Sequence, residues 1–112
     1  MSASKRQAIR DFKERKVSAG IYVLRCEAAG AAWIGVSRNI DAQENSVRFA
    51  LRMGSHPNRD LQAALRAHGA DALSYEVLER IEDPDLSPMG LTDELKRREA
   101  HWLAALGARK LA

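Results

Sequence analysis

The chain has 112 residues, and its 46% hydrophobic and 29% charged content is typical of one globular domain rather than of a disordered or membrane-embedded chain. Its single cysteine, Cys26, excludes an internal disulfide, and no stretch has the length and apolarity of a signal peptide or a membrane span. We therefore expect a cytoplasmic protein without membrane contact, in which Cys26 is a small core residue.

Basic residues are concentrated in the first two-thirds of the chain, although the net charge is only +3. Residues 1–20 carry six basic side chains against two acidic ones, and residues 38–66 add five arginines against three acids. Clustered arginines suit contacts with phosphate groups. The pattern predicts a nucleic-acid-binding face, and the alternative is a solvated helical surface. The candidate contacts are Arg38, Arg48, Arg52 and Arg59.

The N-terminal third of the chain predicts a helix followed by a β-hairpin. Residues 4–16 have the apolar spacing of a short amphipathic helix whose basic side chains face solvent or a phosphate backbone. Residues 20–37 contain two runs rich in β-branched and aromatic residues on either side of a glycine-containing loop, which is typical of a hairpin. Gly20 and Gly35 lie inside these runs, so we expect another part of the molecule to approach the backbone closely at both positions.

Residues 39–69 predict two further helices separated by a turn. Gln43 falls on the apolar stripe of the first helix, whereas Arg48 falls on a polar face in line with Glu44. The second helix has His68 on its predicted buried side. We expect His68 to be a satisfied core or helix-end histidine rather than a ligand.

The last third of the chain predicts a strand, a proline-broken loop and a helix. Residues 73–81 alternate in the manner of a half-buried strand, and residues 91–107 form the predicted last helix. The fold expected from these elements belongs to the α/β (α+β) class. It has a three-stranded, mostly antiparallel sheet, made by the hairpin and the third strand, flanked by four helices.

Glu99 is the most informative polar residue of the last helix. It lies four residues after Leu95 and three before Trp102, near the centre of the apolar stripe. An unpaired carboxylate on a buried face costs several kcal/mol, so Glu99 requires an arginine, a histidine or a metal ion as its partner. From the residues alone, a structural ion pair and a metal or catalytic role both remain open.

Two triplets in the hairpin, Gly20-Ile21-Tyr22 and Trp33-Ile34-Gly35, resemble the signature of the GIY-YIG nuclease family, with Trp33 in place of the second tyrosine. The resemblance extends over nearly all of the chain beyond its first turns. It continues through Asn39, Ile40, Gly54, Ser55, His56, His68, Gly69, residues 75–79 and residues 98–102.

The resemblance implies a single GIY-YIG-like domain over residues 1–112 that hydrolyses phosphodiesters with one hard divalent cation, usually Mg²⁺. In such enzymes a tyrosine or an equivalent base deprotonates the attacking water, and an arginine balances charge on the phosphoryl oxygens. Tyr22 matches that tyrosine, and Glu99 matches the glutamate that holds the metal. His56 is a further candidate for proton transfer or phosphate contact, although a histidine in a turn is more often structural.

Two departures from the family pattern bear on activity. Trp33 has no hydroxyl group, so it can pack or stack but cannot relay a proton as tyrosine can. The family's arginine aligns with the neutral Gln43. Arg48, about one turn further along, is an alternative donor, and Arg52 is a weaker one. The competing interpretation of Arg48 is a surface pair with Glu44.

Three functions follow from the sequence. The first is a GIY-YIG-type endonuclease that acts on nucleic acid, DNA more than RNA, with weak activity. The second is a nucleic-acid-binding module of the same fold that has lost cleavage. The third is a protein-interaction domain whose charge serves solubility.

Overall fold

The computed structural model describes residues 18–82 and 85–111. The predicted N-terminal helix within residues 1–17 lies outside the described residues. The described elements are β1 (Ala19–Cys26), a 3₁₀ turn (Glu27–Ala29), β2 (Ala31–Ser37), α2 (Ile40–Arg52), α3 (Arg59–His68), a second 3₁₀ turn (Ala70–Ala72), β3 (Leu73–Ile81), α4 (Pro88–Leu106) and β4 (Arg109–Lys110).

The described strands form one sheet in the order β3-β1-β2-β4. The predicted hairpin is present as β1 and β2, and β3 returns to pair antiparallel with β1 on its other side. The prediction of three strands was wrong, because the short β4 adds a fourth strand that runs parallel to β2. The sheet is therefore mixed, and its parallel pair involves only two residues of β4.

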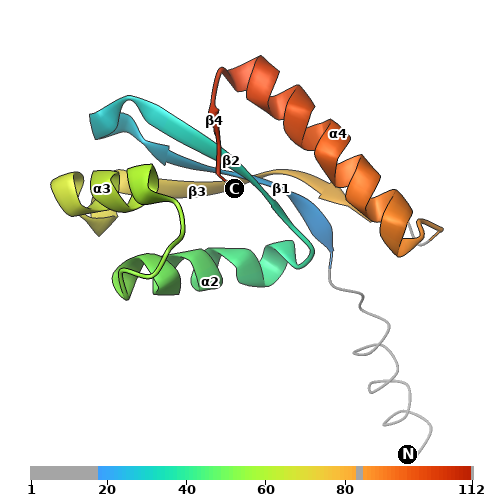
Figure 1. Ribbon diagram of the computed structural model, residues 1–112, viewed down its shortest axis with the longest axis horizontal. Coiled ribbons are helices and arrows are strands. Elements are labelled where there is room, and N and C mark those ends of the chain that lie inside the picture. The colour runs from blue at the N-terminus through green and yellow to red at the C-terminus, as the bar shows by residue number, and fades with distance from the viewer. Residues whose placement is uncertain (1–17, 83–84, 112) are drawn as a thin grey trace, which may run out of the picture.

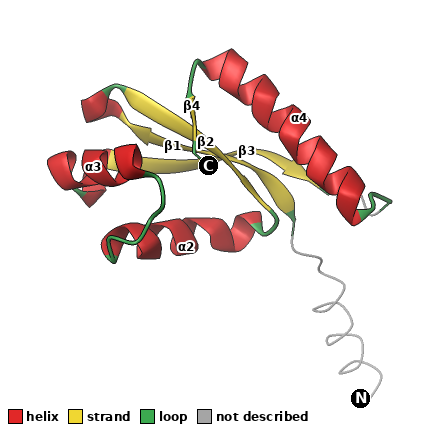
Figure 2. Ribbon diagram, viewed as in Figure 1, coloured by secondary structure: helices red, strands yellow, loops and turns green. Residues whose placement is uncertain are grey.

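The sheet is covered on both faces (Figures 1 and 2). Helices α2 and α3 lie on one face, and α4 crosses the other. Each face has its own apolar cluster: Tyr22, Leu24 and Trp33 pack toward α2 and α3, whereas Ile21 and Val23 pack toward α4. The alternation of β1 thus sends consecutive side chains into two different cores.

The two glycines of the hairpin triplets each leave room for a close neighbour, as expected. A Cβ atom at Gly20 would lie 2.3 Å from the backbone oxygen of Glu79, beside the irregularity in the pairing of β1 with β3. A Cβ atom at Gly35 would lie 2.4 Å from Cζ of Tyr22. Gly20 therefore permits the packing of two strands, and Gly35 permits the placement of the Tyr22 ring.

Side-chain caps define where the described helices begin. The Asn39 and Asn58 side chains accept hydrogen bonds from the first turns of α2 and α3. The last helix begins earlier than predicted, at Pro88 rather than near residue 91, with Ser87 as its N-cap. Proline is compatible with the first turn of a helix because the N–H that it lacks has no partner there.

The prediction that His68 lies on the buried side of its helix was wrong. His68 is exposed and is the last residue of α3. The buried residues of α3 are Leu61 and Ala64, so the last turn leads out to Gly69 at the surface. Within residues 18–82 and 85–111, no helix combines the length and apolarity that crossing a membrane requires.

Candidate active site

Tyr22 lies on β1, and its ring passes over Gly35 of the neighbouring strand. The residue is only 3% exposed and stacks on Tyr75 of β3, with the ring centroids 5.3 Å apart. The Gln43 side chain on α2 donates a long hydrogen bond of 3.4 Å to the Tyr22 hydroxyl. Three elements of the fold therefore fix the position of this hydroxyl group.

The environment of Tyr22 keeps its hydroxyl protonated. Burial of the phenol raises its pKa well above the usual value, and the neighbouring Tyr75 and the charge of Glu99 raise the pKa further. The hydrogen bond from Gln43 offsets only part of this increase. At neutral pH, Tyr22 is therefore a hydrogen-bond donor, and it becomes a base only where additional positive charge lowers its pKa.

Glu99 is a buried carboxylate on α4, with its side chain 11% exposed. The ammonium group of Lys110 lies 3.8 Å from its Oε1 atom, which is too long for a hydrogen bond. The charge of Glu99 is the smallest of the causes that raise the Tyr22 pKa, which links the two residues electrostatically but not by a contact. Lys110 was not predicted, since the two-residue strand that carries it has no periodicity to detect.

The donor set around Glu99 fits a magnesium ion that keeps most of its own water. Within the described parts of the chain, no group of three His, Cys, Asp or Glu residues could enclose a metal ion. Mg²⁺ commonly binds through one or two carboxylates and completes its coordination with water and substrate phosphate. Among the described residues, no cation lies within hydrogen-bond distance of Glu99, so its oxygens retain lone pairs for such an ion.

Gln43 and Arg48 take different positions on α2. Gln43 is half-buried and faces Tyr22, in the phase expected from its place on the apolar stripe. The Nε atom of Arg48 donates to Glu44 at 3.0 Å, which is the surface pair that the sequence offered as an alternative. The neutral side chain, rather than the arginine, is the one beside the Tyr22 hydroxyl.

Trp33 belongs to the core on the α2 and α3 face. It is 1% exposed and packs with Leu24, directly across the hairpin. The Arg109 guanidinium lies over its ring, with Cζ 5.8 Å from the ring centroid. Its buried Nε1–H has no hydrogen-bond partner among the described residues. The tryptophan therefore packs, and without a hydroxyl group it cannot relay a proton.

His56 lies in the turn between α2 and α3, and Asn58 ties this turn to the C-terminal segment. The Nδ1 atom of His56 accepts a hydrogen bond of 3.0 Å from the Asn58 backbone, and burial lowers the pKa of the histidine. The Asn58 side chain in turn donates to the backbone oxygen of Leu111 at 2.9 Å. Leu111 packs beside Tyr22 and Gly35, so the sequence missed a residue that covers the tyrosine.

The predicted phosphate-binding arginines do not all lie together. Arg52 and Arg59 are exposed at the adjoining ends of α2 and α3, on either side of the connecting turn. Arg38 precedes the other end of α2 and donates to the Thr92 hydroxyl group on α4. The 13 residues of α2 span about 20 Å, at 1.5 Å per residue, so Arg38 and Arg52 are well separated.

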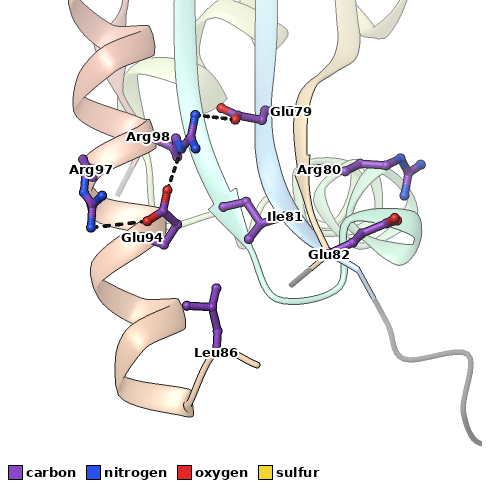
Figure 3. Close-up of a pocket in the computed structure, with 8 residues that line it drawn as sticks. All are labelled: Glu79, Arg80, Ile81, Glu82, Leu86, Glu94, Arg97 and Arg98. Carbon is purple, nitrogen blue, oxygen red and sulfur yellow. Dashed lines mark hydrogen bonds and ion pairs between the residues drawn. The ribbon is translucent and has the colours of Figure 1, made fainter. Parts of the chain in front are cut away.

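A separate hollow of about 620 Å³ lies between the end of β3 and the first half of α4. Figure 3 shows Arg98 between Glu79 and Glu94, at 2.8 and 2.6 Å, and Arg97 paired with Glu94. These ion pairs join the helix to the strand and balance one another's charges. Tyr22 and Glu99 do not line this hollow, so it is distinct from the candidate site.

Comparison with solved structures assigns the fold. The chain has a GIY-YIG-like fold, which confirms at the level of architecture the resemblance carried by the hairpin triplets. It is similar to the catalytic domain of the homing endonuclease I-TevI, with a TM-score of 0.67 and 20% sequence identity over 84% of this chain and 98% of that domain.

A second structure is of a point mutant of the catalytic domain of the intron endonuclease I-TevI. The TM-score is 0.65 and the identity is 20%, over 80% of this chain and 84% of that one. No family model and no curated protein matches the sequence. The likeness therefore rests on three-dimensional arrangement, and the chemistry has to be argued from this chain's own residues.

Proposed function

We propose that this protein is an endonuclease that hydrolyses phosphodiester bonds in DNA and requires Mg²⁺ or another hard divalent cation. The observation that carries the proposal is Glu99, a buried carboxylate whose nearest cation among the described residues, Lys110, is too distant for a hydrogen bond. The fold supports it, because the similar solved domains are catalytic domains of endonucleases. Likeness to a homing endonuclease domain favours DNA over RNA as the substrate.

Glu99 would hold the cation through its carboxylate oxygens, and water and a substrate phosphate oxygen would complete the coordination. A cation bound there would supply positive charge for the leaving oxygen and for the Tyr22 phenol. In hydrolysis the water oxygen bonds to phosphorus, the bond to one sugar oxygen breaks, and that oxygen takes up a proton. Exposed arginines at the ends of α2 and α3 would bind flanking phosphates.

Tyr22 and Gln43 would orient the reacting groups. The Tyr22 hydroxyl is held by Gln43 and lies beside Gly35, so it can donate to a phosphate oxygen or position the attacking water. A cation at Glu99 would offset only the smallest of the causes that raise the Tyr22 pKa, because burial, the largest cause, would remain. Tyr22 would therefore serve as a hydrogen-bond donor that orients the reacting groups.

A nucleic-acid-binding module without cleavage is the second candidate, and Gln43 is the observation that favours it. The neutral amide lies beside the Tyr22 hydroxyl, where a positive donor would balance phosphoryl charge. Loss of one such donor typically lowers the rate by about 100- to 1,000-fold. Weak cleavage or none is the expectation from this residue alone.

Nicking of supercoiled plasmid DNA with Mg²⁺ or with EDTA tests the proposed function. We expect slow, Mg²⁺-dependent nicking that Tyr22→Phe lowers by about 100-fold or more, in the range of a lost acid–base group. Duplex RNA of matched length is the comparison substrate. Binding without nicking would assign the second candidate, and neither binding nor nicking at low salt would favour a protein-interaction domain.

A further inference from the structure

The short strand β4 brings the chain's C-terminal segment to the candidate active site. It pairs with β2 at Trp33 and Ile34, so consecutive side chains of the segment alternate between the two faces of the sheet. Arg109 lies over Trp33 on the α2 and α3 face, whereas Lys110 reaches Glu99 on α4. The register of this strand therefore determines which of two adjacent cations meets the buried carboxylate.

Lys110 is the cation closest to Glu99 among the residues that the structure describes. The other arginines considered for this part of the site are engaged elsewhere: Arg48 bonds to Glu44, and Arg109 stacks on Trp33. Position 43, beside Tyr22, carries no charge. Among the residues that the structure describes, Lys110 is therefore the cation placed to meet a phosphate bound beside Glu99.

The geometry of Lys110 suits a group that changes partner. Its separation of 3.8 Å from Glu99 is longer than a hydrogen bond, so the ammonium is near the carboxylate without being fixed to it. The lysine side chain is 61% exposed, whereas that of Glu99 is 11% exposed, so the ammonium lies on the solvent side of the carboxylate. A flexible four-carbon stem allows the charge to move to a phosphate arriving from solvent.

We propose that Lys110 supplies the cationic donor to the phosphoryl oxygens, in place of an arginine at position 43. The inference rests on the proposed endonuclease function and assigns one of its catalytic groups. In the absence of substrate, the ammonium partly balances the Glu99 charge. With a divalent cation held by Glu99, the Lys110 ammonium would be available to donate to the bound phosphate and to stabilise the negative charge that develops on its oxygens.

The test compares Lys110→Ala, Lys110→Arg and the neighbouring control Arg109→Ala in the Mg²⁺-dependent nicking assay. We expect Lys110→Ala to lower kcat by about 100- to 1,000-fold, as removal of a single donor does. Lys110→Arg keeps most of the rate, and Arg109→Ala leaves it unchanged. Adding Gln43→Arg to Lys110→Ala restores activity, because either position can then present the positive charge.

Metal affinity, measured by calorimetric titration with Mn²⁺ in the absence of DNA, provides a readout other than activity. Removing a positive charge beside Glu99 should tighten Mn²⁺ binding in Lys110→Ala, while kcat falls. If Lys110→Ala lowers only the melting temperature and the wild type still nicks DNA, Lys110 is a structural ion pair and this inference alone is wrong. A wild type that never nicks DNA overturns the endonuclease function, and the role of Lys110 with it.

Discussion

Replacing Gly35 with alanine tests whether this glycine makes room for the Tyr22 ring. The added Cβ would lie 2.4 Å from Cζ and 2.5 Å from the hydroxyl oxygen of Tyr22, about 1 Å short of the 3.4 Å of ordinary contact. The ring cannot yield easily, because it is buried and stacked on Tyr75. The third neighbour, Cδ2 of Leu111, ends a flexible side chain and can move.

Overpacking of this kind costs about 1–3 kcal/mol. A glycine-to-alanine change without strain would instead stabilise the fold by about 0.4–1 kcal/mol through the unfolded chain. The clash dominates, so we expect Gly35→Ala to lower the free energy of unfolding by about 1–2 kcal/mol. Any displacement of the Tyr22 hydroxyl by about 1 Å should also lower nicking by about 100-fold.

Urea unfolding of a double-mutant cycle with Tyr22→Leu isolates the contact. With the ring removed, Gly35→Ala should cost less than about 0.5 kcal/mol. Gly20→Ala is the matched control: it meets the backbone oxygen of Glu79, so its cost should add to that of Tyr22→Leu. If the costs of Gly35→Ala and Tyr22→Leu in free energy of unfolding also add, the steric explanation is refuted.

Two further predictions concern the α2–α3 turn. Burial lowers the His56 pKa from the usual 6.5, and its Nδ1 accepts from Asn58, so stability should be complete above pH 6.5 and fall as the pH drops through the lowered value. Melting temperatures measured between pH 7.5 and 4.5 check this prediction. His56→Gln should remove the part of the pH dependence that belongs to the histidine, and a variant with the pH profile of the wild type would contradict the prediction. Binding of duplex DNA should follow a log–log salt slope of about −4 to −5, and replacing Arg52 and Arg59 together with serine should reduce its magnitude by about 2; an unaltered slope would exclude this pair from the interface.

The hairpin and its glycines could be predicted because each signal is local. β-branched runs on either side of a glycine-containing loop specify the pairing of β1 with β2. The orientation of the Gln43 side chain toward the sheet could be predicted in the same way, because Gln43 lies on the apolar stripe of α2. The burial of Glu99 followed from its place among the apolar residues of α4.

The missing features depend on contacts between distant segments. Strand β4 has two residues, so no alternation marks it, and its partner is set only when the turn after α4 folds back to β2. Lys110 therefore looked like an ordinary basic residue. His68 has the spacing of a buried residue, but α3 passes beyond the core before it ends.

The rate of Mg²⁺-dependent plasmid nicking by Glu99→Gln, relative to wild type, tests the central claim most directly. The substitution preserves the side-chain shape but removes the charge that would bind the cation. Glu94→Gln on the same helix is the control, because its partners are Arg97 and Arg98 in the separate hollow. We predict that Glu99→Gln abolishes nicking and Mn²⁺ binding without loss of the fold, while Glu94→Gln still cuts. Nicking by Glu99→Gln at the wild-type rate, or unchanged Mn²⁺ affinity with only a lower melting temperature, would contradict the account.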